Sequence, residues 1–420
     1  YNNKMVNSES KAYNIVASTK SERTVNPIRV VVDQLVIPKN IPKDKPMIPL
    51  SIGDPSVFGN MPVAQEARKA IIDAVTSTNY NGYPHSMGYP AIRAKVAKHY
   101  SHKDAPLTQD DICLTSGCSQ AIELSITLFC NPGDTILLPK PGFSLYKTIC
   151  ISHGINIKFY NLLPENNWEI DLKQVHSIMD SSVKCILVNN PSNPCGSVFS
   201  KKHILDILAL AKKHAIPIIA DQIYRDMTYG ECKYYGMERL STDVPILECG
   251  GISKQFLCPG WRLGWIFVHD RKGAFKNLRV PLQKLSTIIL GPNSVVQGAL
   301  PQILANVSPD YYKDLNKLLG RHSNILSKGL SEIKGLKVVV PNGAMYMMVG
   351  IDIDMFKDEI KDDVIFSKLL LVEQFVFVLP GQCFNQKNYF RVVICAPDKM
   401  LVSACERIAE FCEKYRKKTF

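Results

Sequence analysis

One lysine and one arginine stand eight residues apart in residues 250–265, a stretch that is otherwise apolar and rich in glycine. They are Lys254 and Arg262, and two unpaired charges would be costly in such surroundings. An apolar pocket drives a lysine toward its neutral amine, which condenses with aldehydes, and an arginine offers a fork of donors to a phosphate. Pyridoxal 5′-phosphate carries both groups. The alternative is a solvent-facing loop lysine and an arginine paired with a carboxylate.

Other polar residues follow predicted strands, at the ends where parallel sheets bind ligands. Asp221 follows the strand 216–220, where a buried carboxylate needs a partner such as a pyridinium N–H, and Tyr224 lies on the same turn. Asn193, held between prolines, could donate its amide to a phenolate oxygen. The run Ser116-Gly117-Cys118 leads into a helix, whose N-terminus suits a phosphate. Caps and ordinary turns are the alternatives.

Two further residues could contribute to a site for an amino acid. Phe143 follows the strand 135–139 and could lie flat on a heteroaromatic ring, although such an aromatic could also be part of the core. Arg391 interrupts the apolar strand 389–395, so its guanidinium must meet an anion. A substrate carboxylate would satisfy it, and an internal ion pair is the alternative.

The elements that would position these residues alternate between strand and helix. Seven strands are predicted near residues 111–115, 135–139, 155–160, 184–189, 216–220, 246–249 and 264–268. Helices near 119–130, 143–152, 171–179 and 201–214 separate the earlier ones. Continuous apolar strands separated by helices indicate an α/β fold with a mostly parallel seven-stranded sheet covered by helices on both faces.

The pattern changes after a helical stretch at 294–332. Paired strands around 341–343, a helix near 364–375, strands at 375–379 and 389–395 and a closing helix from 398 predict a smaller α+β domain. We therefore expect four regions. They are a disordered polar tail (1–25), an N-terminal segment of the small domain (26–64), a large cofactor-binding domain (65–315) and the small C-terminal domain (316–420).

Composition argues against several other classes of protein. The net charge of +12 is spread along the chain without a long basic run, so we expect no nucleic-acid partner. Thirteen cysteines without zinc-like spacing predict free thiols, a reducing compartment such as the cytoplasm, and no metal site. No apolar run is long enough for a membrane span, so no membrane partner is expected. The first 25 residues lack the core of a secretory signal, and a trimmed mitochondrial segment is the less favoured alternative.

Together these motifs resemble those of the fold-type I pyridoxal-phosphate aminotransferases of class I and II, and most of all the animal branch that acts on tyrosine. The resemblance runs from Asn26 to about Cys412. It is carried, in chain order, by Asn26-Pro27-Ile28-Arg29, Ser51-Ile52-Gly53-Asp54-Pro55, Asn81-Gly82-Tyr83, Thr115-Ser116-Gly117-Cys118-Ser119-Gln120, Pro139–Tyr146, Asn189–Ser197, Ala220–Tyr224, Gly250–Trp265, Gly343-Ala344-Met345-Tyr346 and Phe390-Arg391-Val392.

The resemblance implies roles around the cofactor ring. Lys254 would bind the cofactor covalently and then carry a substrate proton, and Asp221 would pair with the pyridinium nitrogen. Asn193 and Tyr224 would hold the phenolate oxygen, while Phe143 would stack on the ring.

It also implies how the charged groups would be held. The substrate α-carboxylate would be bound by Arg391, Asn193 and the backbone near Gly53. The phosphate would be bound by Ser116, Gly117, Cys118, Ser253 and Arg262, with Tyr83 reaching it from the second subunit of a homodimer with shared active sites. Three positions depart from the expected pattern, with Gln255 in place of arginine, Ser253 in place of alanine and Gly251 in place of a phosphate-binding serine.

The implied reaction is transfer of the amino group of L-tyrosine, and of L-phenylalanine, to 2-oxoglutarate. It would give 4-hydroxyphenylpyruvate and L-glutamate, the first step of tyrosine catabolism. The alternatives are a transaminase that prefers alanine, kynurenine or methionine, a carbon–sulfur lyase of the same fold, and a non-catalytic binding module. The intact set of Lys254, Asp221, Tyr224 and Arg391 argues against the last, because a purely structural protein needs no buried lysine.

Overall fold

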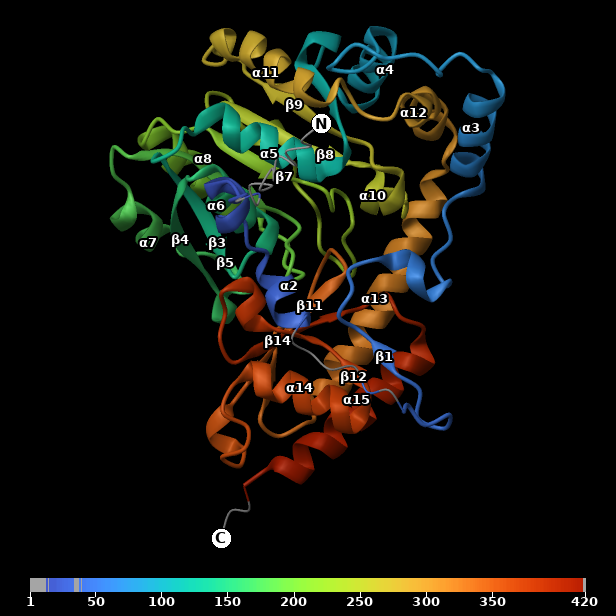
Figure 1. Cartoon of the computed structure of the whole chain (residues 1–420), viewed down its shortest axis with the longest axis vertical. Coiled ribbons are helices and arrows are strands. Elements are labelled where there is room, and N and C mark those ends of the chain that lie inside the picture. The colour runs from blue at the N-terminus through green and yellow to red at the C-terminus, as the bar shows by residue number, and fades with distance from the viewer. Residues whose placement is uncertain (1–12, 14, 34–37, 39, 418–420) are drawn as a thin grey trace, which may run out of the picture.

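The computed structural model describes residues 13, 15–33, 38 and 40–417, which fold around two main sheets (Figure 1). The larger sheet has the strand order β2-β9-β8-β7-β6-β3-β4-β5. Its strands are β2 (Ile112–Thr115), β3 (Thr135–Lys140), β4 (Asn156–Leu163), β5 (Glu169–Ile170), β6 (Val183–Asn189), β7 (Ile218–Asp221), β8 (Ile246–Gly251) and β9 (Gly264–His269).

The prediction of a mostly parallel sheet is confirmed, but the count of seven strands is wrong. The five strands from β8 to β4 are parallel, and β2, β9 and β5 are antiparallel to their neighbours. The eighth strand, β5, pairs with the end of β4 through two residues only. Ile170 faces Leu162, and Glu169 faces Leu163. Two residues are too short to show the alternation of apolar and polar residues by which a strand is predicted.

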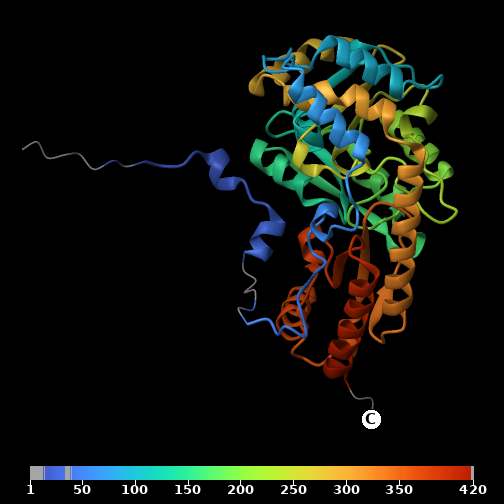
Figure 2. The ribbon, with the colours of Figure 1, turned by 90° about the vertical axis from the view of Figure 1, so that its right-hand side faces the viewer.

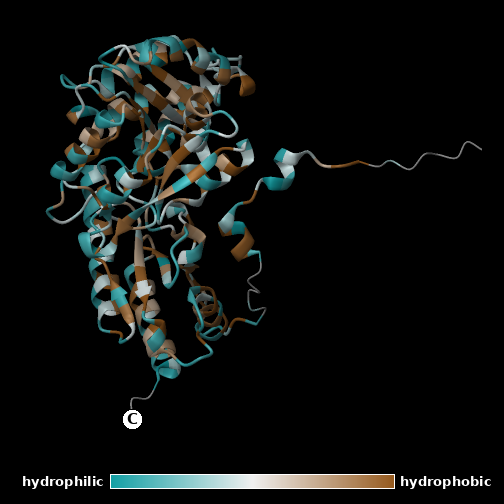
Figure 3. Cartoon of the chain, turned by 90° about the vertical axis from the view of Figure 1, so that its left-hand side faces the viewer, coloured by the Kyte–Doolittle hydropathy of each residue, from teal (hydrophilic) through white to brown (hydrophobic). Residues whose placement is uncertain are grey.

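Helices cover both faces of this sheet because alternate residues of its strands point to opposite sides. Cys185 and Leu187 of β6 pack toward α5 (Gly117–Phe129) and α6 (Ser144–His153). Ile186 and Val188 pack in a second core with α8 (Lys201–Lys213) on the opposite face. The same face carries, near β2 and β9, a third core with α3 (Gln65–Thr76), α4 (Pro90–Tyr100) and α12 (Ser294–Asn306). The outer helices accordingly show both hydrophilic and hydrophobic stretches (Figure 3).

The smaller sheet has the order β10-β11-β14-β13 and is antiparallel. The long helix α13 (Pro309–Ser331) runs along the molecule from the larger sheet to the smaller one (Figure 1). The other elements here are β10 (Leu336–Val338), β11 (Tyr346–Ile351), α14 (Asp363–Gln374), β12 (Val376–Phe377), β13 (Leu379–Pro380), the 3-10 helix η8 (Gly381–Phe384), β14 (Tyr389–Val393) and α15 (Asp398–Tyr415). One strand was predicted at 375–379, and the chain instead forms β12 and β13, which belong to different sheets.

The N-terminal part of the chain is joined to the C-terminal part. β1 (Ile48–Pro49) pairs in parallel with β12, and Figure 2 shows this blue segment beside the red one. β1 ends at Pro49, and residues 50–54 are irregular. This irregular stretch exposes backbone carbonyl groups that strands would have used.

Part of the tail predicted to be disordered is helical in the structure. α1 (Thr19–Arg23) is capped by the Ser18 side chain, and the Arg23 guanidinium donates to the Ser152 carbonyl at the end of α6. α2 (Pro27–Val32) begins at an Asn26 cap and packs between α6 and η8. Residues 1–12 of the expected tail lie outside the described residues. No helix within the described ranges is long and apolar enough to cross a membrane.

Candidate active site

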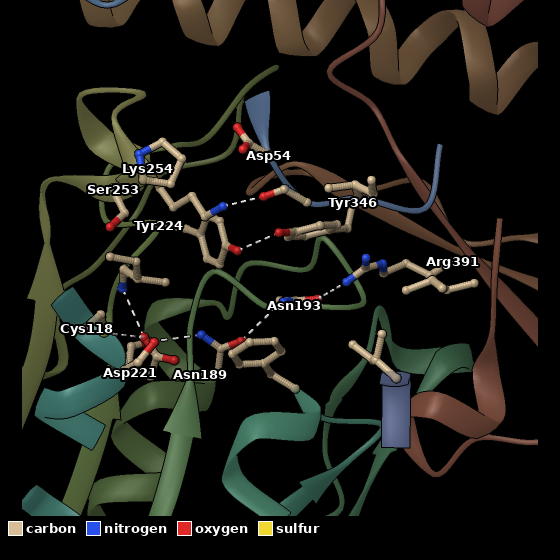
Figure 4. Close-up of a pocket in the computed structure, with 18 of the residues that line it drawn as sticks. Asp54, Cys118, Asn189, Asn193, Asp221, Tyr224, Ser253, Lys254, Tyr346 and Arg391 are labelled. Atoms are coloured by element: carbon tan, nitrogen blue, oxygen red, sulfur yellow. Dashed lines mark hydrogen bonds between the residues drawn. The ribbon is translucent and has the colours of Figure 1, made fainter. Parts of the chain in front are cut away.

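A cavity of about 480 Å³ lies between the two sheets, within the size range of small-molecule sites. The carboxyl ends of β6, β7 and β8 form one wall, and β11, β14 and the irregular segment 50–54 form the other (Figure 4). The predicted site residues that line it are Gly53, Cys118, Phe143, Asn193, Asp221, Tyr224, Ser253, Lys254, Arg262 and Arg391. The topology thus brings together side chains that lie up to 338 positions apart, from Gly53 to Arg391.

Asp221 is the last residue of the central strand β7, and it is 2% exposed. Burial raises the pKa of its carboxyl above the ordinary value, although the Tyr146 hydroxyl donates to it at 2.5 Å and the Ile223 N–H at 3.2 Å. The Cys118 thiol contacts the same carboxyl at 3.7 Å. No cation of the described residues offsets the desolvation. A cationic ligand group at the cavity floor would do so.

Lys254 lies in the short helix α10 (Ile252–Gln255), which follows the buried end of β8. Its Nζ donates to the Gly53 carbonyl oxygen at 2.5 Å across the cavity (Figure 4). The ammonium group therefore lies inside the cavity rather than in solvent, which excludes the loop-lysine alternative. An amine held at this point is within reach of any ligand that occupies the cavity.

Asn193 and Tyr224 connect the two walls. The Asn193 N–H donates to the Asn189 side-chain oxygen at 2.7 Å, and the Asn193 side-chain oxygen accepts from Arg391 at 2.9 Å. The Tyr224 and Tyr346 hydroxyls are 2.8 Å apart. Burial and the neighbouring Tyr346 raise the pKa of Tyr224 well above the ordinary value, so its hydroxyl stays protonated.

Arg391 is 3% exposed and has no carboxylate partner among the described residues. Its Nη1 and Nη2 bond to the Asn193 side chain and the Ser51 carbonyl oxygen, and its Nε has no hydrogen-bond partner. Burial lowers the pKa of this guanidinium from its ordinary value. The internal ion pair considered from the sequence is therefore absent, and a buried cation with a free donor faces the cavity.

The opposite end of the cavity has the features of an anion site. α5 begins at Gly117 without a side-chain cap, and Cys118 of its first turn lines the cavity. Gly117 has φ +73°, and a Cβ there would lie 2.3 Å from an Arg262 Nη atom, so only glycine lets this guanidinium approach the helix. Ser116 and Gly117 are the residues immediately before Cys118 and do not line the cavity themselves.

The three departures from the family pattern have different structural settings. A Cβ at Gly251 would lie 2.8 Å from the Leu263 carbonyl oxygen, so a serine does not fit there without a backbone shift. The Gln255 side chain faces away from the cavity, where its oxygen accepts from the Tyr100 hydroxyl at 3.1 Å. Ser253 lines the cavity and is buried.

Tyr83 is the predicted site residue that the structure places elsewhere. It is 90% exposed and lies beside a separate surface hollow formed with residues 289–294. Phe143, by contrast, precedes α6 and meets Tyr146 edge to face at 5.7 Å, with its ring at the cavity wall. A role for Tyr83 would need a second subunit.

Among the cavity residues that received no role from the sequence, three have side chains that contact predicted site residues. Tyr146 donates to Asp221, Asn189 holds both Asn193 and the Asp221 carbonyl oxygen, and Tyr346 contacts Tyr224. Tyr146 follows Phe143 by three positions, and in the predicted helix 143–152 this spacing places both on one face, which could have indicated Tyr146. Tyr346 is brought to the cavity by tertiary structure alone.

A buried charge cluster lies behind the Asp221–Tyr224 turn. Arg225 makes salt bridges to Glu238 and, at 2.5 Å, to Glu248, and Glu248 also pairs with His269 at 2.9 Å. Gln222 donates to Glu238 at 3.0 Å. Burial by itself raises the pKa of Glu238, but Arg225, His269 and the Gln222 hydrogen bond together outweigh it and hold that pKa below the ordinary range. Gln222 and Arg225, which directly follow Asp221 and Tyr224, are thus both bound to the Glu238 carboxylate.

These residues fit pyridoxal 5′-phosphate. The uncompensated Asp221 carboxylate matches a pyridinium N–H, the uncapped start of α5 beside Arg262 matches a phosphate, and Lys254 matches an aldehyde. Within the described residues no cluster of histidine, cysteine or acidic side chains is arranged to hold a metal ion.

Known proteins with similar sequences and folds are aminotransferases. The family model "Aminotransferase class I and II" matches residues 45–408. Tyrosine aminotransferase of Mus musculus is 51% identical over 404 residues, covering 96% of this chain and 88% of its own, and that of Dictyostelium discoideum is 46% identical over 417 residues, covering 98% and 99%. The crystal structure of tyrosine aminotransferase from Leishmania infantum superposes with a TM-score of 0.92 at 33% identity, covering 97% of this chain and 100% of that one. The chain therefore belongs to the class I and II aminotransferases, the family of enzymes that use pyridoxal phosphate.

Proposed function

We propose that this enzyme transfers the amino group of L-tyrosine, and of L-phenylalanine, to 2-oxoglutarate. The observation that carries the proposal is the opposition of Lys254 and Arg391 in one cavity whose floor is Asp221 (Figure 4). An amine, a buried cation without a counter-charge and a buried carboxylate are what an α-amino acid and pyridoxal phosphate require together. The relatives named tyrosine aminotransferase support tyrosine as the donor.

Bound pyridoxal phosphate supplies an aldehyde that condenses with amines and a ring that accepts electrons. We propose that Lys254 holds this aldehyde and then moves the proton at the substrate Cα, because its Nζ is already inside the cavity. Asp221 would stabilise the protonated ring nitrogen, and Tyr146 would keep that carboxylate ionised. Asn193 and Tyr224 would donate to the phenolate oxygen, and Phe143 would cover one face of the ring.

The phosphate of the cofactor and the α-carboxylate of the substrate would be held by hydrogen-bond donors at opposite ends of the cavity. Ser116, Gly117, Cys118, Ser253 and Arg262 would bind the phosphate, and the free Nε and the Nη atoms of Arg391 would bind the substrate α-carboxylate. A carboxylate that replaced the Ser51 and Asn193 oxygens would relieve the unpaired charge of Arg391. The Gly53 carbonyl, which accepts from Lys254, would be released when the amine reacts.

A homodimer with shared sites is part of the proposal. Tyr83 is exposed on a loop beside Ile289 (45% exposed) and Leu290 (56% exposed), an apolar patch that a second subunit would cover. Tyr83 would then reach the phosphate of the partner's site. Mixed Tyr83→Phe and Lys254→Ala subunits should form hybrids with one site that carries both defects and one that carries neither, and an active monomer in sedimentation would contradict the proposal.

We also propose that the enzyme works in the cytosol, since all thirteen cysteines are free thiols.

Transamination by the purified enzyme tests the function directly. Tyrosine, phenylalanine, alanine, kynurenine and methionine would each be supplied as donor with 2-oxoglutarate, with Lys254→Ala as the matched control. We expect the highest kcat/KM with tyrosine, and no turnover by Lys254→Ala although it still binds the cofactor. A higher kcat/KM with another donor would overturn the tyrosine preference. Release of ammonia or a thiol without an oxo-acid acceptor would favour a lyase.

A further inference from the structure

Two buried tyrosines meet in the cavity, and the proposed function gives a ligand to only one of them. Tyr224 is assigned to the phenolate oxygen of the cofactor, while Tyr346 has no assigned partner in a ligand. The two hydroxyl oxygens are 2.8 Å apart, and the residues are 3% and 2% exposed. Neither hydroxyl has another hydrogen-bond partner within the described part of the chain. Each therefore depends on the other for its hydrogen bond inside the protein.

The number of protons decides which of the two oxygens can donate to a ligand. A phenolic hydroxyl has one proton to donate. If Tyr224 donated to Tyr346, it would have no proton left for a ligand oxygen. If Tyr346 donates to Tyr224, the Tyr224 proton remains available, because burial raises the pKa of that hydroxyl and keeps the proton bound. The second direction is therefore the one that fits the proposed role of Tyr224.

The surroundings of the Tyr346 ring hold it in one orientation. Tyr346 is the first residue of β11, and it pairs with Val393 of β14 in the small sheet. Cζ of Arg391 lies 4.5 Å from the centre of the Tyr346 ring, and the Tyr224 ring meets it edge to face at 5.7 Å. The hydroxyl also lies so close to Gly53 that a Cβ at that position would clash with it. These contacts keep the Tyr346 hydroxyl beside the Tyr224 oxygen (Figure 4).

We propose that Tyr346 is a positioning residue, which donates to the Tyr224 oxygen and so directs the Tyr224 proton to the phenolate oxygen of the cofactor. The inference rests on the proposed role of Tyr224, and it adds a second tyrosine from the opposite wall of the cavity. Hydrogen bonds in such a chain polarise one another, because a hydroxyl that accepts one bond becomes a better donor in the next. Tyr346 thus acts on the cofactor only through Tyr224.

The test measures the pKa of the nitrogen that joins Lys254 to the cofactor, from the absorbance of the loaded enzyme at different pH values without substrate. A donor to the neighbouring phenolate oxygen stabilises that oxygen most after the nitrogen has lost its proton, so removal of a donor raises this pKa. We expect Tyr224→Phe to raise it by about 1–2, as for loss of a hydrogen bond to a charged oxygen. Tyr346→Phe keeps the ring and should raise it by about 0.2–0.6, because one bond in a chain strengthens the next by about 10–30%. Asp221 and Arg391, the charged groups that act on Tyr224, are the same in every variant.

A double variant separates this role from a structural one. In the Tyr224→Phe background, Tyr346→Phe has no hydroxyl to act on, so it should change the pKa no further. Tyr229→Phe is the matched control. It removes a buried hydroxyl that donates to the Gly343 carbonyl oxygen at 3.0 Å outside the cavity, and it should leave the pKa unchanged.

An unchanged pKa in Tyr346→Phe, or an equal rise in both backgrounds, would overturn the proposal. An unchanged pKa in Tyr224→Phe would overturn it together with the role of Tyr224. The measurement uses no substrate, so an enzyme that preferred another amino donor would contradict the proposed function and leave this inference standing.

Discussion

Replacement of Arg391 by methionine separates ligand binding from structural support. Arg391→Met keeps an unbranched apolar stem but removes the charged guanidinium, whose Cζ lies 4.5 Å and 4.7 Å from the centres of the Tyr346 and Phe384 rings. Because Arg391 has no carboxylate partner within the described structure, no buried anion is left behind in the free enzyme. In the complex, by contrast, the substrate carboxylate would lose its only buried cation.

The size of the expected fall in kcat/KM follows from this difference between the free enzyme and the substrate complex. Truncation of one partner of a buried, hydrogen-bonded charge pair costs about 2–5 kcal/mol. This corresponds to a fall of about thirtyfold to several-thousandfold in kcat/KM. In the free enzyme, the oxygens of Ser51 and Asn193 lose a donor, at about 1–3 kcal/mol each, while relief of the desolvated charge offsets part of that cost. We therefore expect the Tm to fall by only a few degrees.

The assay measures kcat/KM for tyrosine and for 2-oxoglutarate, together with the Tm and the Kd of the cofactor. Both kcat/KM values should fall alike, because each substrate presents an α-carboxylate, and the Kd of the cofactor should not change. Arg407→Met is the matched control, since Arg407 is also buried and bonds to the Pro46 and Gln374 carbonyl oxygens outside the cavity. Wild-type kcat/KM in Arg391→Met, or a large loss of Tm together with cofactor binding, would refute the reasoning.

Three further variants probe the residues around Asp221. Burial raises the pKa of Asp221, so the folded apoenzyme keeps a proton that the unfolded chain releases, and stability falls as pH rises above the ordinary Asp range of about 4. In thermal unfolding, Asp221→Asn should abolish this loss of stability at higher pH. It should also raise the Kd of the cofactor at least about tenfold. An unchanged cofactor Kd would count against the role of Asp221. Tyr146→Phe should raise the Kd of the cofactor by about threefold to tenfold in fluorescence titration. The control Tyr160→Phe loses a 2.7 Å hydrogen bond to the Leu187 carbonyl oxygen and should leave that Kd unchanged. Glu238→Gln should cost about 3–5 kcal/mol of unfolding free energy at neutral pH, because Arg225 loses a buried partner. The depressed pKa of Glu238 means that this contribution is present above the ordinary Glu range and is lost as the pH falls through the folded pKa, so wild type and variant should converge in acid.

Residues at the ends of strands were the most predictable part of the site. Asp221 ends the apolar strand β7 and Lys254 lies just beyond β8, and a polar residue at the end of such a strand in a parallel sheet lies at its carboxyl edge. Arg391 was predictable for a related reason, because a charge in an apolar strand needs an anion, although the sequence left open whether that anion belonged to the protein. In the described structure Arg391 has no carboxylate partner, so the internal ion pair is absent, and binding of a ligand anion stays a prediction.

Features that depend on tertiary packing were not accessible from the sequence. Tyr346 reaches Tyr224 only because β11 faces the large sheet, and no local pattern records that meeting. β5 is two residues long, and the division of residues 376–380 between two sheets occurs within a run of uniform apolar character. The helix α1 was missed because its five residues are polar and it owes its position to Arg23, which donates to the Ser152 carbonyl oxygen on α6.

The bonds that close the cavity have a consequence for the order of folding. The Arg391 bond to Ser51 joins residues 340 positions apart, and the bonds from Lys254 to Gly53 and from Arg391 to Asn193 span 201 and 198 positions. Closing such loops costs chain entropy that only the later contacts repay, so these contacts form slowly. The chain can thus complete most of its helices and the parallel sheet before it has an active site. During synthesis, the site is not complete until β14 has left the ribosome and met residues 50–54, which are made before it.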